Sequence, residues 1–195
     1  IECKSTLEDR EKTTTEIQTK YNLTFIHPSN DLDVILGNST VVSELIQDHA
    51  NLDYILCPIG GGGLIAGSAL ACNAYSNKCE IIGVEPLNVN DAYRSLKSKK
   101  IEYNLKTDTI ADGLRTNLGD INFPIILDYI KSIICVNEDE IINAMKLIFN
   151  KLNILIEPSS AVAFAGLLKE KEKFKGKKVG VILSGGNVDS NKLPF

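Results

Sequence analysis

The chain has 195 residues, of which 44% are hydrophobic and 24% charged, a composition typical of one globular unit with a core of its own. Its formal net charge of −4 gives no reason to expect nucleic acid or an anionic membrane surface as a partner. The sequence contains no apolar stretch of transmembrane length and no signal peptide, so we expect no membrane partner either.

The five cysteines are odd in number and include no C-x-x-C pair, which favours reduced thiols and a cytoplasmic location. Only two histidines accompany them, so a zinc site is a weak hypothesis.

Apolar runs rich in β-forming residues alternate with helical patterns along most of the chain. In chain order we predict the end of a strand at 1–3, a strand at 23–26, a helix at 41–52, a strand at 54–59, a helix at 64–75, strands at 80–85 and 132–136, a helix after residue 136, a helix at 159–172 and a strand at 178–183.

The helix after residue 136 is the best signalled. Asn137 can cap it, Glu140 can complete a capping box, and Val136 can pack on Ile141 as a hydrophobic staple. Its apolar positions, at spacings of four, three and four residues, predict a single buried face formed by Ile141, Met145, Ile148 and Leu152.

The predicted strands are continuously apolar and do not alternate, which indicates burial on both faces. We therefore expect an α/β fold with an open, twisted, mostly parallel sheet flanked by helices. Such sheets bind ligands at the carboxyl ends of their strands.

Four consecutive glycines, Gly60, Gly61, Gly62 and Gly63, follow one predicted strand and precede a helix. Residues without side chains let backbone N–H groups converge on an anion, and the helix adds the positive end of its dipole. A flexible turn is the alternative, but four glycines carry a large entropic cost for a turn alone. The pattern favours a phosphate cradle that is neither a Rossmann motif nor a P-loop.

Two further features lie at strand ends. Ser184, beside two glycines after the last strand, could present a neutral hydroxyl to a ligand, or simply cap a turn. Glu85 and Asp91 flank a short polar loop, and two carboxylates with a loop carbonyl suit a hard cation such as Mg²⁺ or Ca²⁺, although acidic residues in such loops are commonly just solvated.

Five segments, in this order and spacing, resemble the fold-type II pyridoxal-phosphate (PLP) enzymes of the serine racemase and threonine dehydratase branch. They are Pro58–Gly67, Gly83–Pro86, Thr109–Leu114, Leu155–Ala161 and Leu183–Asn187. The resemblance covers nearly the whole chain. It implies the large-domain portion of the tryptophan synthase beta-like fold, with residues 1–30 ending the small domain and residues 31–195 forming an incomplete PLP-binding domain.

The resemblance also implies roles for individual residues. Gly60 to Gly63 would hold the PLP phosphate and Ser184 the pyridine nitrogen, with Glu157 near the cofactor. Glu85, the Val89 carbonyl and Asp91 would form a divalent-cation site for Mg²⁺ or Ca²⁺. Arg10 and Thr116 would line the substrate pocket.

The family's Schiff-base lysine and the base on the opposite face of the cofactor precede the segments matched here, so we assign no catalytic residue within the chain. We expect a homodimeric PLP enzyme acting on a small amino acid, serine or also threonine. Its reactions would be serine racemisation and elimination of water from serine to give pyruvate and ammonia. The alternatives are a threonine/serine dehydratase and a non-catalytic domain that binds a phosphate ligand.

Overall fold

In the computed structural model, which describes residues 1–4 and 6–195, the strands form one parallel sheet in the order β3-β2-β1-β4. The strands are β1 (Tyr54–Pro58), β2 (Glu80–Pro86), β3 (Ile133–Val136) and β4 (Val179–Val181). All four run in the same direction, so their carboxyl ends lie on the same side of the sheet. The predicted sheet class is confirmed.

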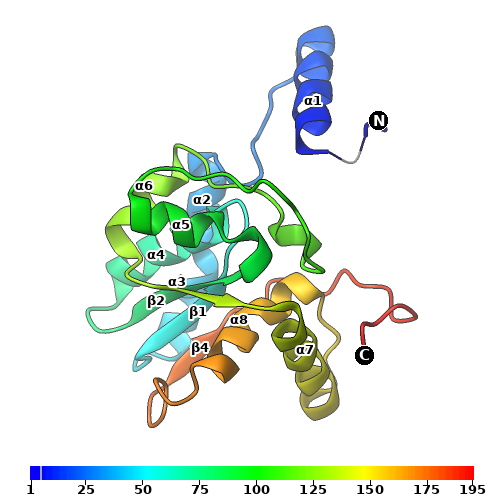
Figure 1. Cartoon of the computed structure of the whole chain (residues 1–195). Helices are drawn as coiled ribbons and strands as arrows, with labels where there is room; N and C mark the ends of the chain where they lie inside the picture. Colours follow the sequence, from blue (N-terminus) through cyan, green and yellow to red (C-terminus); the bar gives the residue numbers. More distant parts are fainter. Residues whose placement is uncertain (5) are drawn as a thin grey trace.

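Helices cover both faces of this sheet and make a three-layer sandwich (Figure 1). One face carries α2 (Leu32–Asn38), α3 (Thr40–Asp48), α4 (Gly63–Tyr75) and α6 (Asn122–Tyr129). The other carries α7 (Glu138–Leu152) and α8 (Pro158–Lys169). Helix α5 (Asp91–Ser98) lies beside β3. Helix α1 (Leu7–Tyr21) stands apart from the sheet at one end of the molecule (Figure 1).

Each face of the sheet has its own core, because successive residues of a strand point to opposite faces. Within β1, Ile55 and Cys57 belong to the cluster that packs under α2, α3, α4 and α6. Leu56, between them, belongs to the cluster under α7 and α8. Burial on both faces explains why the strands read as continuous apolar runs.

The start of α7 confirms the expected capping box. The Asn137 side chain accepts from the Glu140 amide at 2.9 Å, and the Glu140 carboxylate accepts from the Asn137 amide at 2.7 Å. Ile141, Met145 and Ile148 are buried as predicted, but Leu152 is 59% exposed, because the helix ends there and passes beyond its neighbours.

Two strand predictions are wrong. Residues 23–26 have no regular secondary structure, and Leu23, Phe25 and Ile26 are exposed. Residues 1–3 are likewise irregular and exposed. Apolar β-formers give a strand only where a neighbour completes the hydrogen bonds, and neither segment has one among the described residues.

Helices α2, α5 and α6 were not predicted, α4 and β2 are each one residue longer than expected, and several other elements end earlier than expected. Helix α3 ends at Asp48, α8 ends at Lys169, and β4 is reduced to Val179–Val181. No helix in the described residues combines the length and apolarity needed to cross a membrane.

Candidate active site

The glycine loop lies at the carboxyl end of β1 and opens α4. Gly62 is the N-cap of this helix and has φ +87°, in the left-handed region that residues with a side chain rarely adopt. Gly63 begins the helix. The four glycines are buried.

The walls around the loop leave no room for side chains. A Cβ atom on Gly60 would lie 2.9 Å from the Leu114 Cα, and one on Gly63 would lie 2.9 Å from the Ser29 Cα. Because both obstacles are backbone atoms, they cannot move aside as a flexible side chain could. The glycines are therefore required by packing as well as by conformation.

The amides of the loop are free. In the described part of the chain, the N–H groups of Gly60, Gly61 and Gly62 have no hydrogen-bond acceptor. The first helical hydrogen bond of α4 runs from the Ala66 amide to the Gly62 carbonyl, at 3.0 Å. Buried amides are nearly always paired. Three unpaired ones at the positive end of a thirteen-residue helix form a cradle suited to a phosphate.

Asn122, which the sequence interpretation missed, clamps this loop. Its side-chain amide donates to the Gly61 carbonyl at 2.7 Å and to the Ser29 carbonyl at 2.9 Å. Its Oδ1 accepts from the Gly119 amide at 3.1 Å. The residue is fully buried. A polar residue directly before the apolar run Phe-Pro-Ile-Ile-Leu was the only available signal.

Ser184 lies three residues after the end of β4, the strand that pairs with β1. It is therefore on the same side of the sheet as the glycine loop, at the carboxyl ends of the strands. Its side chain is exposed. The turn that carries it is held by Glu157, whose amide donates to the Gly185 carbonyl at 3.2 Å and whose carboxylate accepts from the Asn187 amide at 3.1 Å. Glu157 thus positions the turn.

A hollow of about 620 Å³ brings three of the predicted residues together. Arg10 of α1, Gly61 of the loop and Thr116 all line it. A Cβ on Gly61 would lie 3.1 Å from the Thr116 hydroxyl, so the hydroxyl lies directly over the loop. Ser184 does not line this hollow.

The residues predicted to bind a cation lie in a second, buried region, at the end of β2 and the start of α5. Glu85 and Asp91 are both fully buried. The Glu85 carboxylate accepts from the Ala92 and Tyr93 amides, each at 3.0 Å, at the start of α5. Asp91 accepts from the Leu118 amide at 3.1 Å and from the side chain of Asn104.

Burial shifts both carboxyl groups toward protonation. Desolvation, and then the charge of Asp91, raises the pKa of Glu85 well above its usual value. Desolvation raises the pKa of Asp91 to about 6. Val89 is buried in the same turn. No cluster of three or more His, Cys, Asp or Glu side chains occurs in residues 1–4 and 6–195, so a cation here would also need carbonyl or water oxygens.

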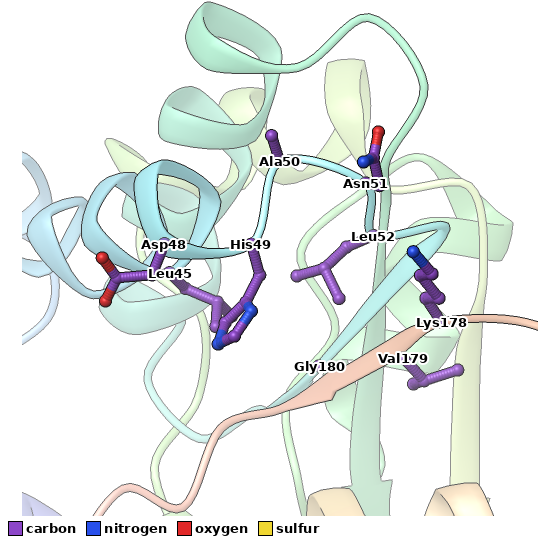
Figure 2. A pocket seen from close by; sticks show the side chains of 9 residues that line it. All are labelled: Leu45, Asp48, His49, Ala50, Asn51, Leu52, Lys178, Val179 and Gly180. Atoms are coloured by element: carbon purple, nitrogen blue, oxygen red, sulfur yellow. The ribbon is translucent and has the colours of Figure 1, made fainter.

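Another hollow, of about 560 Å³, lies at the opposite edge of the sheet (Figure 2). His49 and Leu52 line it beside Gly180 of β4, near the amino end of that strand. It contains none of the predicted site residues, and parallel sheets place their ligands at the other edge.

Comparison with known proteins agrees with this geometry. Residues 1–185 match the family model described as "Pyridoxal-phosphate dependent enzyme". The chain is 44% identical to a serine racemase of Dictyostelium discoideum, with 98% of this chain and 60% of the relative covered. It is 41% identical to a beta-hydroxyaspartate dehydratase of Paracoccus denitrificans, with 100% of this chain and 62% of the relative covered.

Among solved structures, maize serine racemase superposes with a TM-score of 0.93 at 38% identity, covering 97% of this chain and 60% of that one. The chain thus spans about three-fifths of the length of the relatives that it matches. The fold, the free glycine amides and these matches lead to one conclusion: the chain belongs to the pyridoxal-phosphate dependent enzyme family.

Proposed function

We propose that this chain supplies the phosphate-binding and ring-nitrogen-binding part of a PLP enzyme that racemises serine and eliminates water from it. The observation that carries the proposal is the glycine loop, with its buried, unpartnered amides at the start of α4. PLP, when bound, supplies an electron sink for cleavage of a bond to the α-carbon of an amino acid.

The glycine loop fits the phosphate of this cofactor. The amides of Gly60, Gly61 and Gly62 are free to donate, and the α4 dipole favours an anion at the same point. Side chains are excluded by the backbone of Ser29 and Leu114, so the anion can approach the amides closely. Asn122 keeps the loop in place before the ligand arrives.

Ser184 would face the pyridine nitrogen, in a turn that Glu157 holds. A neutral hydroxyl, unlike a carboxylate, does not keep that nitrogen protonated. The electron sink is then weaker, and positioned acids and bases take a larger share of the proton transfers.

Arg10 and Thr116 would bind the substrate in the hollow beside Gly61. The Arg10 guanidinium is exposed there and can pair with a substrate carboxylate, while the Thr116 hydroxyl can hydrogen-bond to a small polar side chain. A pocket that hydrogen-bonds a substrate hydroxyl discriminates against analogues that lack it.

Glu85, Asp91 and the Val89 carbonyl would hold Mg²⁺ or Ca²⁺. The support is electrostatic: burial raises the pKa of both carboxyl groups, the charge of Asp91 raises that of Glu85 further, and a divalent cation would offset both effects. Its role would be to stabilise the segment between β2 and α5, since neither Glu85 nor Asp91 lines the hollow that Arg10 lines.

We also propose that the protein is a cytoplasmic homodimer. The unpaired cysteines of the described chain favour a reducing compartment. The dimer follows from family membership, and sedimentation of the full-length protein would test it.

A second candidate activity is dehydration of threonine or of a hydroxylated aspartate. The observation favouring it is that identity to the Paracoccus dehydratase, 41%, nearly equals the 44% to the Dictyostelium racemase. Sequence similarity alone does not separate the two reactions.

The test uses the full-length protein with added PLP. Chiral chromatography would follow D-serine formed from L-serine, and a lactate dehydrogenase assay would follow pyruvate. L-threonine and L-threo-3-hydroxyaspartate serve as competing substrates. We expect D-serine and pyruvate from serine. 2-Oxo acid formation from the competing substrates without any D-serine would favour the dehydratase, and failure to bind PLP would leave a non-catalytic phosphate-binding domain.

A further inference from the structure

Two cysteines lie close together near the amino ends of the strands, on the opposite side of the sheet from the ends that carry the glycine loop. Cys72 lies in the last part of α4, and Cys79 directly precedes β2. The Cys72 thiol donates to the Cys79 carbonyl at 3.1 Å. The sulfur of one cysteine is thus held against the backbone of the other, and we call these two residues the Cys72–Cys79 pair.

The turn between them is fixed at both ends. The Ser76 amide, at the end of α4, donates to the Cys72 carbonyl at 2.9 Å. The Ser76 hydroxyl accepts from the Cys79 amide at 3.1 Å and from the Lys78 amide at 3.4 Å. The proximity of the pair is therefore built into the turn.

The thiols of the pair also differ electrostatically. Their side-chain hydrogen bond lowers the pKa of Cys72 and raises the pKa of Cys79 far above its usual value. Cys72 is therefore the thiol of the pair that ionises more readily, and the thiolate is the reactive form. Burial raises the pKa of Cys57 to about 12 and that of Cys135 to about 11, so neither is favoured as the thiolate that attacks the peroxide in the first step.

A small oxidant can reach the pair. Both cysteines line a hollow of about 370 Å³ at the surface. Cys79 is only partly buried, and Cys72 is buried at the wall of the same hollow. The hollow also contains Lys131, paired with Glu80 at 2.9 Å, so its charges are largely balanced.

We propose that the Cys72–Cys79 pair is a redox site, which a peroxide converts into an intramolecular disulfide. The Cys72 thiolate attacks the peroxide oxygen, the O–O bond breaks, and a sulfenic acid forms with release of one water after proton transfer. The Cys79 sulfur then attacks the sulfenic sulfur, the S–O bond breaks, and a second water leaves with the thiol proton. Two thiols and one hydrogen peroxide thus give one disulfide and two waters.

The disulfide would tie the end of α4 to the start of β2 without touching the proposed cofactor site. The glycine loop lies at the other end of α4, which by its thirteen residues is about 20 Å long. We therefore expect the disulfide to restrain the unfolded chain and to leave the basal activity intact.

The experiment oxidises the reduced full-length protein with stoichiometric hydrogen peroxide, blocks remaining thiols with N-ethylmaleimide, and maps the tryptic peptides without reduction by mass spectrometry. Trypsin cuts after Lys78, between the two cysteines, so the disulfide joins two separate peptides. The variant Cys79→Ser removes one partner, and Cys135→Ser, also a partly buried free thiol, is the matched control.

The expected result is peptide 21–78 joined to peptide 79–94, lighter by two hydrogens than the sum of its parts, with fragment ions that place the link at Cys72 and not at Cys57, which the same peptide contains. The linked peptide should form from the wild type and from Cys135→Ser and be absent from Cys79→Ser. The disulfide should raise the thermal unfolding midpoint of the protein, and reduction with dithiothreitol should reverse this increase. The proposal would be overturned if maleimide labelled both Cys72 and Cys79 after a peroxide dose that oxidises the exposed Cys3. So would Cys72 joined to Cys57, or a link between two chains. The wild-type map decides the matter even if Cys79→Ser does not fold.

Discussion

The Asn122 side chain donates a 2.7 Å hydrogen bond to the carbonyl of Gly61, joining the start of α6 to the loop that opens α4. The same amide group bonds to Ser29, which comes from the segment before α2. One buried side chain therefore fixes the glycine loop to two other parts of the chain. It acts as a positioning residue, since it uses the carbonyl of Gly61 and leaves the loop amides free for a ligand.

Replacing Asn122 with alanine should loosen the glycine loop. Three hydrogen bonds are lost, and buried carbonyls are left unpaired, at about 1–3 kcal/mol for each unsatisfied group. We expect lower stability in urea titration and weaker PLP binding in the full-length protein. Asn143→Ala, on the exposed side of α7, is the control and should change neither. Unchanged PLP affinity in a folded Asn122→Ala protein would contradict the clamp.

Gly62→Ala should be far more damaging than Gly37→Ala. The φ of +87° at Gly62 costs a residue with a side chain about 1–3 kcal/mol, and its Cβ would also lie 2.7 Å from the Asn122 Oδ1. At Gly37, near the end of α2, a Cβ meets nothing within 4 Å. Inorganic phosphate, titrated by calorimetry, should bind the wild type and Gly37→Ala but not Gly62→Ala. Equal phosphate binding by all three proteins would show that the glycine loop does not bind the phosphate.

Divalent cations should stabilise the protein in a pH-dependent way. In their absence Asp91, with its pKa raised from 3.8 to about 6, and Glu85, raised likewise, keep protons in the folded state that the unfolded chain has already released. The contribution of Asp91 to stability therefore falls as pH rises from about 4 to about 6, and that of Glu85 falls as pH rises above its unfolded pKa. A bound cation requires both groups ionised and removes this loss.

The thermal midpoint, scanned from pH 4.5 to 7.5 with EDTA or with Mg²⁺, measures the effect. The stabilisation by Mg²⁺ should be small at the acid end and grow as pH passes 6. Glu85→Gln should abolish it, whereas Glu80→Gln, at the exposed end of the same strand, should keep it. A constant Mg²⁺ effect across this range would argue against binding at the pair.

Asn137→Ala should weaken the start of α7. The substitution removes the capping-box acceptor of the Glu140 amide, which is worth about 0.5–2 kcal/mol. We expect a lower urea midpoint with unchanged PLP affinity, because α7 covers the sheet face opposite α4. Loss of PLP binding without loss of stability would show that the helix contributes to the site.

The sheet and its ligand edge could be predicted because both depend on local patterns. Continuous apolar runs such as Tyr54–Pro58 record burial on both faces, and the glycines record a backbone that needs no Cβ. The cap at Asn137 is equally local. Each of these signals lies within a few residues of the feature that it predicts.

The clamp and the outlying helix could not be predicted, for different reasons. Asn122 reaches Gly61 across 61 positions of sequence, and nothing nearby marks it. Helix α1 has few apolar residues and so lacks the periodic stripe that reveals a helix, although Thr6 caps it. The false strand at 23–26 shows the converse error, in which apolar residues suggest a sheet that no neighbouring strand completes.

The place of β4 constrains the order in which the protein can fold during synthesis. Strand β4 follows the other three strands in the sequence, yet it pairs with β1, and the Lys178 amide donates to the Asp53 carboxylate across 125 positions. On the ribosome, β1 and β2 can pair while β4 is still unmade, which leaves one side of β1 unpaired until β4 has emerged. Unpaired strand edges invite association with other chains. This edge is therefore where a nascent chain most needs a chaperone, and slowed translation before residue 179 would prolong the exposure.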